Sequence, residues 1–137
     1  MWEDGRNKDG GRWVLQMGKK TMIGSPGNEQ PALDLYWLEV LMCLIGEGWG
    51  SPEHGCEVNG AVISMRGEGN RKDTTRTNKN SKLAVWLADC EKVQAVVNIG
   101  LNIKSRLGLG SRANIQFDAH QDTKAKTGSM VRHMYNI

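Results

Sequence analysis

Three short segments of this chain alternate between apolar and polar side chains, and this pattern constrains the fold more than any other feature. The segments are residues 12–17, 60–66 and 82–87. A period of two places successive side chains on opposite faces of a β-strand. Each segment is therefore predicted to be a strand with one buried face, and the last two strands are expected to pair as a hairpin.

Two longer segments have apolar residues at helical spacing. Residues 32–48 are predicted to form a helix capped by Asp34, with one apolar stripe packed in the core. The stripe consists of Leu35, Leu38, Leu41 or Met42, and Ile45. Residues 89–110 are predicted to form a second helix, capped by Asp89 and weakened by Gly100.

Shorter strands are expected at residues 113–117 and near residues 135–137. Helices with a single apolar face, interleaved with antiparallel strands, are typical of the α+β class. We therefore predict an antiparallel sheet with helices on one side and a polar face on the other.

The length and the hydropathy of the chain limit its class. The chain has 137 residues, which suits one domain. It contains no apolar run of the roughly 20 residues that span a bilayer, and its first residues are polar, so neither a membrane span nor a signal peptide is expected. We expect a cytoplasmic protein, with the nucleus as a second location.

The cysteines and the net charge exclude several kinds of site. Cys43, Cys56 and Cys90 are far apart and form no C-x-x-C pair. This spacing predicts buried, reduced thiols rather than a disulfide framework or a structural zinc site, and we expect no metal and no cofactor. The formal net charge is +3, so an anion site must come from the local placement of basic residues.

The less apolar face of each predicted strand carries one basic residue: Arg12, Arg66 or Lys82. Trp86 shares a face with Lys82 and lies roughly 13 Å farther along the strand. A sheet face with basic groups and an exposed indole suits a ligand that is both phosphorylated and aromatic. This combination indicates a nucleotide.

The pair Trp2-Glu3 near the start of the chain would complete such a site. An indole stacks on a purine, most strongly when the purine is cationic. An ionised carboxylate only accepts hydrogen bonds, so it favours the N–H groups on the pairing edge of guanine over adenine. From these two residues alone, a surface glutamate beside a loosely packed tryptophan is an equally good interpretation.

Several segments, in this order, resemble the eukaryotic translation initiation factor 4E family of messenger RNA cap-binding proteins. They are MWED, GGRW, YWLEVLMCLIGE, GAVISMR, KLAVW, RLGLG and HQDTKAKTGS. The match runs over nearly the whole chain and is interrupted at residues 71–81. It implies a curved antiparallel β-sheet with helices on the convex face and a concave face that binds the 7-methylguanosine cap.

The resemblance implies that seven residues bind the cap. They are Trp2, Glu3, Arg12, Arg66, Lys82, Trp86 and Lys126. Trp2 would be one of two tryptophans around the methylated base, Glu3 would pair with the guanine edge, and Trp86 would lie against the N7-methyl group. The three basic strand residues would reach the phosphates, and Lys126 would contact the distal phosphates or the next nucleotide.

The resemblance also implies a partner surface and a modification site. In the family, the outer surface of the first helix binds a Y-x-x-x-x-L-φ helix of an initiation factor 4G-type scaffold or of 4E-binding repressor proteins. The candidate contacts are Leu38, Glu39 and Met42, although apolar spacing alone favours a core position for Leu38 and Met42. Ser129 matches the family's tail phosphorylation site, where a phosphate would meet basic side chains.

Three features depart from the family pattern. The strands, the helix and the other stacking tryptophan that precede Trp2 in the family are missing, so residues 1–137 are expected to form one cap-binding domain that is incomplete at its amino-terminal side. Glu68 stands where the family usually has a lysine, which should weaken phosphate binding. Residues 67–81 are predicted to form a polar, basic insertion loop.

The leading hypothesis is a protein that binds the mRNA cap and recruits it for translation initiation through the scaffold, and that is not an enzyme. A second hypothesis is a truncated relative that has lost cap binding and acts only as an interaction module for scaffold or repressor helices. A third is hydrolytic, since Asp118, His120, Asp122 and Ser129 include the residue types of nucleophilic catalysis. No nucleophile elbow or metal motif accompanies them.

Overall fold

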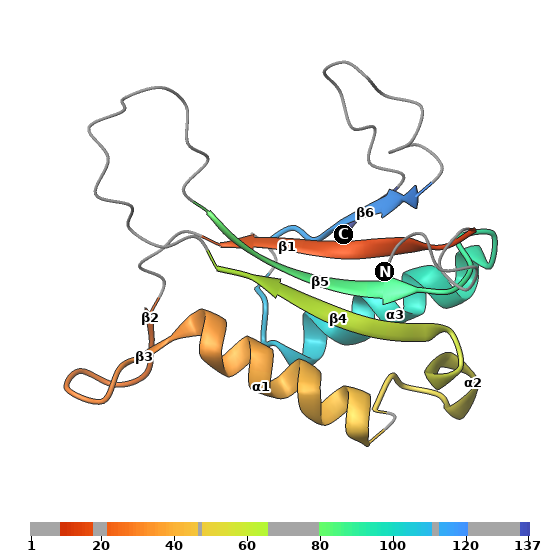
Figure 1. The fold of residues 1–137 in the computed structure, drawn as a ribbon. Helices are drawn as coiled ribbons and strands as arrows, with labels where there is room; N and C mark the ends of the chain where they lie inside the picture. Colours follow the sequence, from red (N-terminus) through yellow and green to blue (C-terminus); the bar gives the residue numbers. More distant parts are fainter. Residues whose placement is uncertain (1–8, 18–21, 47, 66–79, 111–112, 121–134) are drawn as a thin grey trace, which may run out of the picture.

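Five strands form one antiparallel sheet with the order β4-β5-β1-β6-β7 (Figure 1). In chain order they are β1 (Gly11–Met17), β4 (Val58–Ser64), β5 (Ser81–Leu87), β6 (Gln116–Ala119) and β7 (Tyr135–Asn136). A separate two-stranded ladder pairs β2 (Met22–Ile23) with β3 (Gln30–Pro31). The residues described in this computed structural model are 9–17, 22–46, 48–65, 80–110, 113–120 and 135–137.

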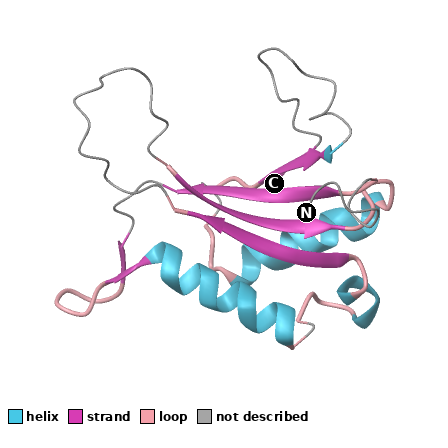
Figure 2. Cartoon of the chain, in the orientation of Figure 1, coloured by secondary structure: helices cyan, strands magenta, loops and turns pink. Residues whose placement is uncertain are grey.

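Two long helices, α1 (Ala32–Ile45) and α3 (Val93–Arg106), lie on the same side of the sheet (Figures 1 and 2). The strands curve, and the helices cover the convex side (Figure 1). A single turn, α2 (Pro52–Gly55), lies between α1 and β4. The hydrophobic core lies between the sheet and the helices. This is the α+β arrangement that the sequence predicts.

The period-two alternation is confirmed in the central strand. Trp13, Leu15 and Met17 of β1 belong to the core, so Arg12 and Gln16 lie on the opposite face. The predicted pairing of β4 with β5 is confirmed as well, in antiparallel register. The strand predicted at residues 113–117 runs instead over Gln116–Ala119.

The predicted buried stripe of α1 is wrong. Leu38 and Ile45 are 56% and 85% exposed. The side of α1 that is buried carries Ala32, Val40 and Cys43 instead. The helix is apolar on both sides, so the spacing of its apolar residues fits two stripes, and only packing selects the buried one.

Both predicted helix caps are also wrong. Pro31 precedes α1, and Asp34 lies in the first turn, where a carboxylate still favours the positive end of the helix dipole. Lys92 precedes α3. Asp89 accepts a hydrogen bond at 2.8 Å from the backbone N–H of Glu91, outside the helix.

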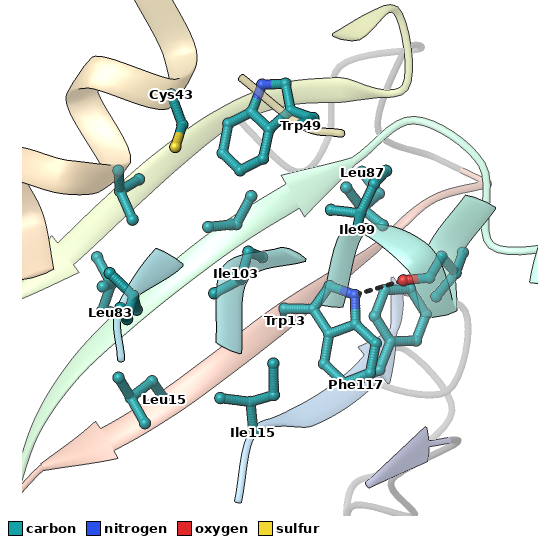
Figure 3. Close-up of a cluster of buried hydrophobic side chains, with 14 of the residues drawn as sticks. Trp13, Leu15, Cys43, Trp49, Leu83, Leu87, Ile99, Ile103, Ile115 and Phe117 are labelled. Carbon is teal, nitrogen blue, oxygen red and sulfur yellow. Dashed lines mark hydrogen bonds between the residues drawn. The ribbon is translucent and has the colours of Figure 1, made fainter. Parts of the chain in front are cut away.

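Gly100 is a close-packing position of α3, and the helix continues through it from Val93 to Arg106. A Cβ atom added there would lie 2.4 Å from Cζ2 of Trp13 and 2.7 Å from Cδ1 of Ile137. The missing side chain lets α3 approach β1 closely enough for the indole Nε1 of Trp13 to donate a 2.9 Å hydrogen bond to the carbonyl of Val96 (Figure 3). A side chain at position 100 would therefore collide with Trp13 and Ile137, so this packing requires glycine.

The cysteines are free thiols in different environments. Cys43 is buried as expected, whereas Cys56 is exposed, which corrects the expectation of buried thiols. In the part of the chain that the structure describes, no cluster of three or more metal-ligating side chains occurs. None of the helices described there is long and apolar enough to cross a membrane. Ser81 of the predicted 67–81 loop is the first residue of β5.

Candidate functional site

The face of the sheet opposite α1 and α3 gathers polar side chains from three neighbouring strands, and we call it the polar face. Its members are Arg12 and Gln16 of β1, Lys82 and Trp86 of β5, and Asp118 of β6. Arg12 is the direct cross-strand partner of Trp86 on one side and of Asp118 on the other. One row of the polar face therefore reads Trp86, Arg12, Asp118 across three strands.

The structure brings three of the predicted cap-binding residues onto the polar face. Arg12 and Trp86 are neighbours, and Lys82 pairs with Gln16 four residues along the same two strands. Each of the three is partly accessible. The other predicted residues, Trp2, Glu3, Arg66, Lys126 and the phosphorylation candidate Ser129, lie outside the described residues.

Arg12 is a cation with unused hydrogen-bonding capacity. Its Nε lies 3.9 Å from Oδ2 of Asp118, and the two side chains are 38% and 8% exposed. That separation exceeds hydrogen-bond length. The Nε atom is buried and donates no hydrogen bond among the residues described. A guanidinium has five N–H donors, and the Arg12 side chain is partly exposed, so it suits an anionic ligand.

Trp86 is held against a histidine ring. The ring centroids of Trp86 and His120 are 4.8 Å apart, with an interplanar angle of 44°. His120 is 3% exposed, so it supports one side of the indole from inside the protein. The indole Nε1 of Trp86 is buried and makes no hydrogen bond within the described part of the chain. Trp86 thus presents a fixed aromatic surface beside Arg12.

Sequence reasoning missed Asp118 and His120 as members of this site. From the sequence, these two residues were candidates only for hydrolytic catalysis, because the predicted strand ended at residue 117. With β6 extending to Ala119, the same period-two rule places Gln116 and Asp118 on one face, and the ring contact with Trp86 places His120 beside them. The available signal was therefore the continued alternation beyond residue 117.

The outer side of α1 forms a second exposed surface, and we call it the helix stripe. It consists of Leu38, Met42 and Ile45, which are 56%, 61% and 85% exposed. The spacing i, i+4, i+7 aligns them along one side of the helix. Aligned exposed apolar side chains are typical of a docking surface for an amphipathic helix. Leu38 and Met42, which the resemblance makes candidate partner contacts, thus lie on the surface and not in the core.

Glu39 beside the helix stripe takes part in an ion pair between the two helices. Its Oε1 lies 3.8 Å from Nη1 of Arg106 at the end of α3. Cys43, one turn farther along α1, is buried below this pair. Burial raises the pKa of the Cys43 thiol; the positive charge of Arg106 opposes this shift and the negative charge of Glu39 adds to it. This thiol is therefore protonated at neutral pH.

The family model for eukaryotic initiation factor 4E matches residues 1–134 of the chain. The chain belongs to this family. Eukaryotic translation initiation factor 4E of Aplysia californica is 38% identical over 137 residues, which are 100% of this chain and 54% of that protein. The human factor is 36% identical with the same two coverages. The chain thus spans about half the length of these curated initiation factor 4E relatives.

Solved structures of the initiation factor 4E family share the fold. Ascaris suum eIF4E-3 in complex with an m2,2,7G cap is 32% identical with a TM-score of 0.75, and the match covers 100% of this chain and 62% of that one. A schistosome eIF4E in complex with m7GpppG and 4E-BP is 31% identical with a TM-score of 0.74, covering 100% and 63%.

Proposed function

We propose that this chain binds the 7-methylguanosine cap of messenger RNA on its polar face and acts in translation initiation, without catalysing a reaction. The observation that carries the proposal is the row in which Trp86 lies directly beside Arg12, with Lys82 farther along the same face. Solved family members that match the whole chain hold cap ligands. Because translation takes place in the cytoplasm, we expect the protein there.

The chemistry of the polar face suits the two halves of a cap. N7 methylation gives guanine a positive charge, and a cationic ring is attracted to the electron-rich face of an indole such as Trp86. The guanidinium of Arg12 and the ammonium of Lys82 suit the negatively charged phosphates. We assign Trp2 to base stacking, Glu3 to the guanine edge, and Arg66 and Lys126 to the phosphate chain, in line with the family.

Titration with 7-methyl-GTP, monitored by tryptophan fluorescence, tests the proposal. We expect quenching, with an affinity about tenfold higher than for GTP, because a cation–π contact contributes about 0.5–2 kcal/mol. Equal affinities for the two ligands would show that only the phosphates bind. Absence of binding by a folded sample would contradict the proposal for this chain.

We also propose that the helix stripe recruits a scaffold subunit or a repressor through a Y-x-x-x-x-L-φ helix, with Leu38, Glu39 and Met42 as contacts. The exposed stripe beside the Glu39–Arg106 pair supports this. A schistosome family member was solved with 4E-BP bound, and Caenorhabditis elegans eIF4E-3 with the 4E-binding protein Mextli. Apolar anchors in the groove and a charge at its rim are common in helix recognition.

Leu38→Asp is expected to weaken binding of a fluorescent Y-x-x-x-x-L-φ peptide at least about thirtyfold, because buried apolar anchors contribute 2 kcal/mol or more. Leu101→Asp on α3 is the matched control, since Leu38 and Leu101 are similarly exposed at 56% and 50%. Anisotropy titrations measure both variants. Equal losses in the two variants would rule out the helix stripe as the peptide site.

The same assay separates the alternative function. Peptide binding by a folded wild-type chain that fails to bind 7-methyl-GTP would favour an interaction module that regulates scaffold or repressor proteins. The exposure of the helix stripe supports that candidate independently of the polar face.

A further inference from the structure

The ring of His120, the residue that follows β6, lies against Trp86 of β5, although these two strands are not neighbours. In the sheet, β1 lies between β5 and β6. The ring centroids of Trp86 and His120 are nevertheless 4.8 Å apart, with an interplanar angle of 44°. This contact therefore joins two strands that share no backbone hydrogen bonds with each other.

His120 is itself held firmly in place. In the ladder between β1 and β6, Gly11 pairs with Ala119, and the backbone N–H of His120 continues it with a 2.9 Å hydrogen bond to the carbonyl of Gly10. The side chain is 3% exposed. A buried ring on an anchored backbone has few orientations open to it. His120 thus offers the indole of Trp86 a fixed surface.

Trp86 has few other contacts that could set the orientation of its indole. Its Nε1 atom is buried and donates no hydrogen bond in the described part of the chain. The indole of Trp13, by contrast, is oriented by its hydrogen bond to the carbonyl of Val96. Among the residues described, the only ring that contacts Trp86 is that of His120.

The orientation of this indole matters for binding a cationic base. The attraction between a cation and an indole requires the cation to lie over the face of the ring. A side chain that is already fixed in the binding orientation loses less conformational entropy when the ligand binds. The phosphate contacts of Arg12 and Lys82 do not depend on the plane of this ring.

We propose that His120 is a positioning residue that fixes the indole of Trp86 and thereby sets the selectivity for 7-methylguanine over guanine. The inference rests on the proposed cap-binding function. It gives the residue after β6 a part in base recognition that is exerted through Trp86. The imidazole ring provides this support, independently of any hydrogen bond that its nitrogen atoms make.

The test compares the affinities of wild type and His120→Ala for 7-methyl-GTP and GTP by isothermal titration calorimetry. We expect His120→Ala to bind 7-methyl-GTP about fivefold more weakly, because the ligand must then immobilise a mobile indole. The affinity for GTP should stay within about twofold, since an uncharged base gains less from the ring face. The ratio of the two affinities should therefore fall.

Two further variants separate the ring from its hydrogen-bonding groups. His120→Phe keeps a flat ring against Trp86 and should retain the wild-type ratio within about twofold. His120→Asn keeps an amide in place of the imidazole nitrogen but removes the ring, so it should lose selectivity as the alanine variant does. It also serves as the test variant if His120→Ala does not fold, with circular dichroism as the check.

A double-mutant cycle tests whether His120 acts through Trp86. In the Trp86→Ala background, His120→Ala should change the affinity for 7-methyl-GTP by less than about twofold. His54→Ala is the matched control, because the Nδ1 atom of His54 lies 3.2 Å from the carbonyl oxygen of another tryptophan, Trp49, outside the polar face. This variant should leave the ratio of affinities unchanged.

The outcomes separate the inference from the function on which it rests. If 7-methyl-GTP binds and the ratio is the same in wild type and in the two variants without a ring, the role of His120 is refuted and cap binding stands. An equal fall in His54→Ala or in His120→Phe, or a full further loss in the Trp86→Ala background, would also refute it. If wild type and all variants fail to bind 7-methyl-GTP, both proposals are refuted.

Discussion

Trp13→Ala is expected to lower the free energy of unfolding by about 4 kcal/mol, since truncation of a buried tryptophan usually costs 3–5 kcal/mol. The indole is 2% exposed and contacts the ring of Phe117 at a centroid distance of 5.2 Å. It also fills the space that Gly100 leaves open. Since small domains have only about 5–15 kcal/mol of stability, this loss brings the chain close to unfolding.

Urea denaturation followed by circular dichroism measures the effect of Trp13→Ala. Trp13→Phe is the conservative control: it keeps a ring beside Phe117 but loses the hydrogen bond to the carbonyl of Val96. We expect a smaller cost of about 1–2 kcal/mol for this variant. An alanine variant within about 1 kcal/mol of wild type would contradict the packing described for α3 against β1.

Trp86→Ala is expected to lower the affinity for 7-methyl-GTP at least tenfold and to change the unfolding free energy by only about 1 kcal/mol. Aromatic contacts to a base contribute about 1–3 kcal/mol, whereas Trp86 lies on the polar face and outside the main core. Trp13 pairs with Val85, the residue before Trp86, so the two tryptophans lie one position apart in the register and on opposite faces of the sheet. The two alanine variants should therefore affect different properties.

Isothermal titration calorimetry measures the loss of affinity directly and does not depend on a tryptophan signal. Trp86→Phe is the matched control, because it keeps an aromatic ring against His120 and should retain most of the affinity. Unchanged binding by Trp86→Ala would remove Trp86 from the proposed site. A large loss of stability in the same variant would instead assign it to the core.

The strands and their faces were predictable from the sequence because period-two alternation is a local property. Arg12, Lys82 and Trp86 lie on the polar face as predicted, because successive side chains of a strand point to opposite faces of the sheet. Asp118 was not predicted to lie on this face, because the end of β6 depends on its pairing with β1. The local sequence pattern does not show this pairing. The likeness to the cap-binding family supplied Trp2 and Glu3, for which residue chemistry alone left two interpretations.

The helices were harder to predict in detail. Apolar spacing located α1 correctly but selected Leu38 and Ile45 as buried, because nothing in the spacing distinguishes a core side from a docking side. Gly100 was interpreted through helix propensity, whereas its role depends on Trp13, 87 positions away in the sequence. Such a long-range fit becomes visible only when the elements are packed.

The two-sided character of α1 has a consequence for divergence within the family. Leu38, Met42 and Ile45 face solvent, so substitutions there are expected to change the free energy of unfolding little. Substitutions at Val40 or Cys43 are expected to disturb the core and to lower the stability. One helix thus carries two sets of positions under separate physical constraints: the solvent-facing set can vary in chemistry while the packing of α1 against the sheet stays unchanged.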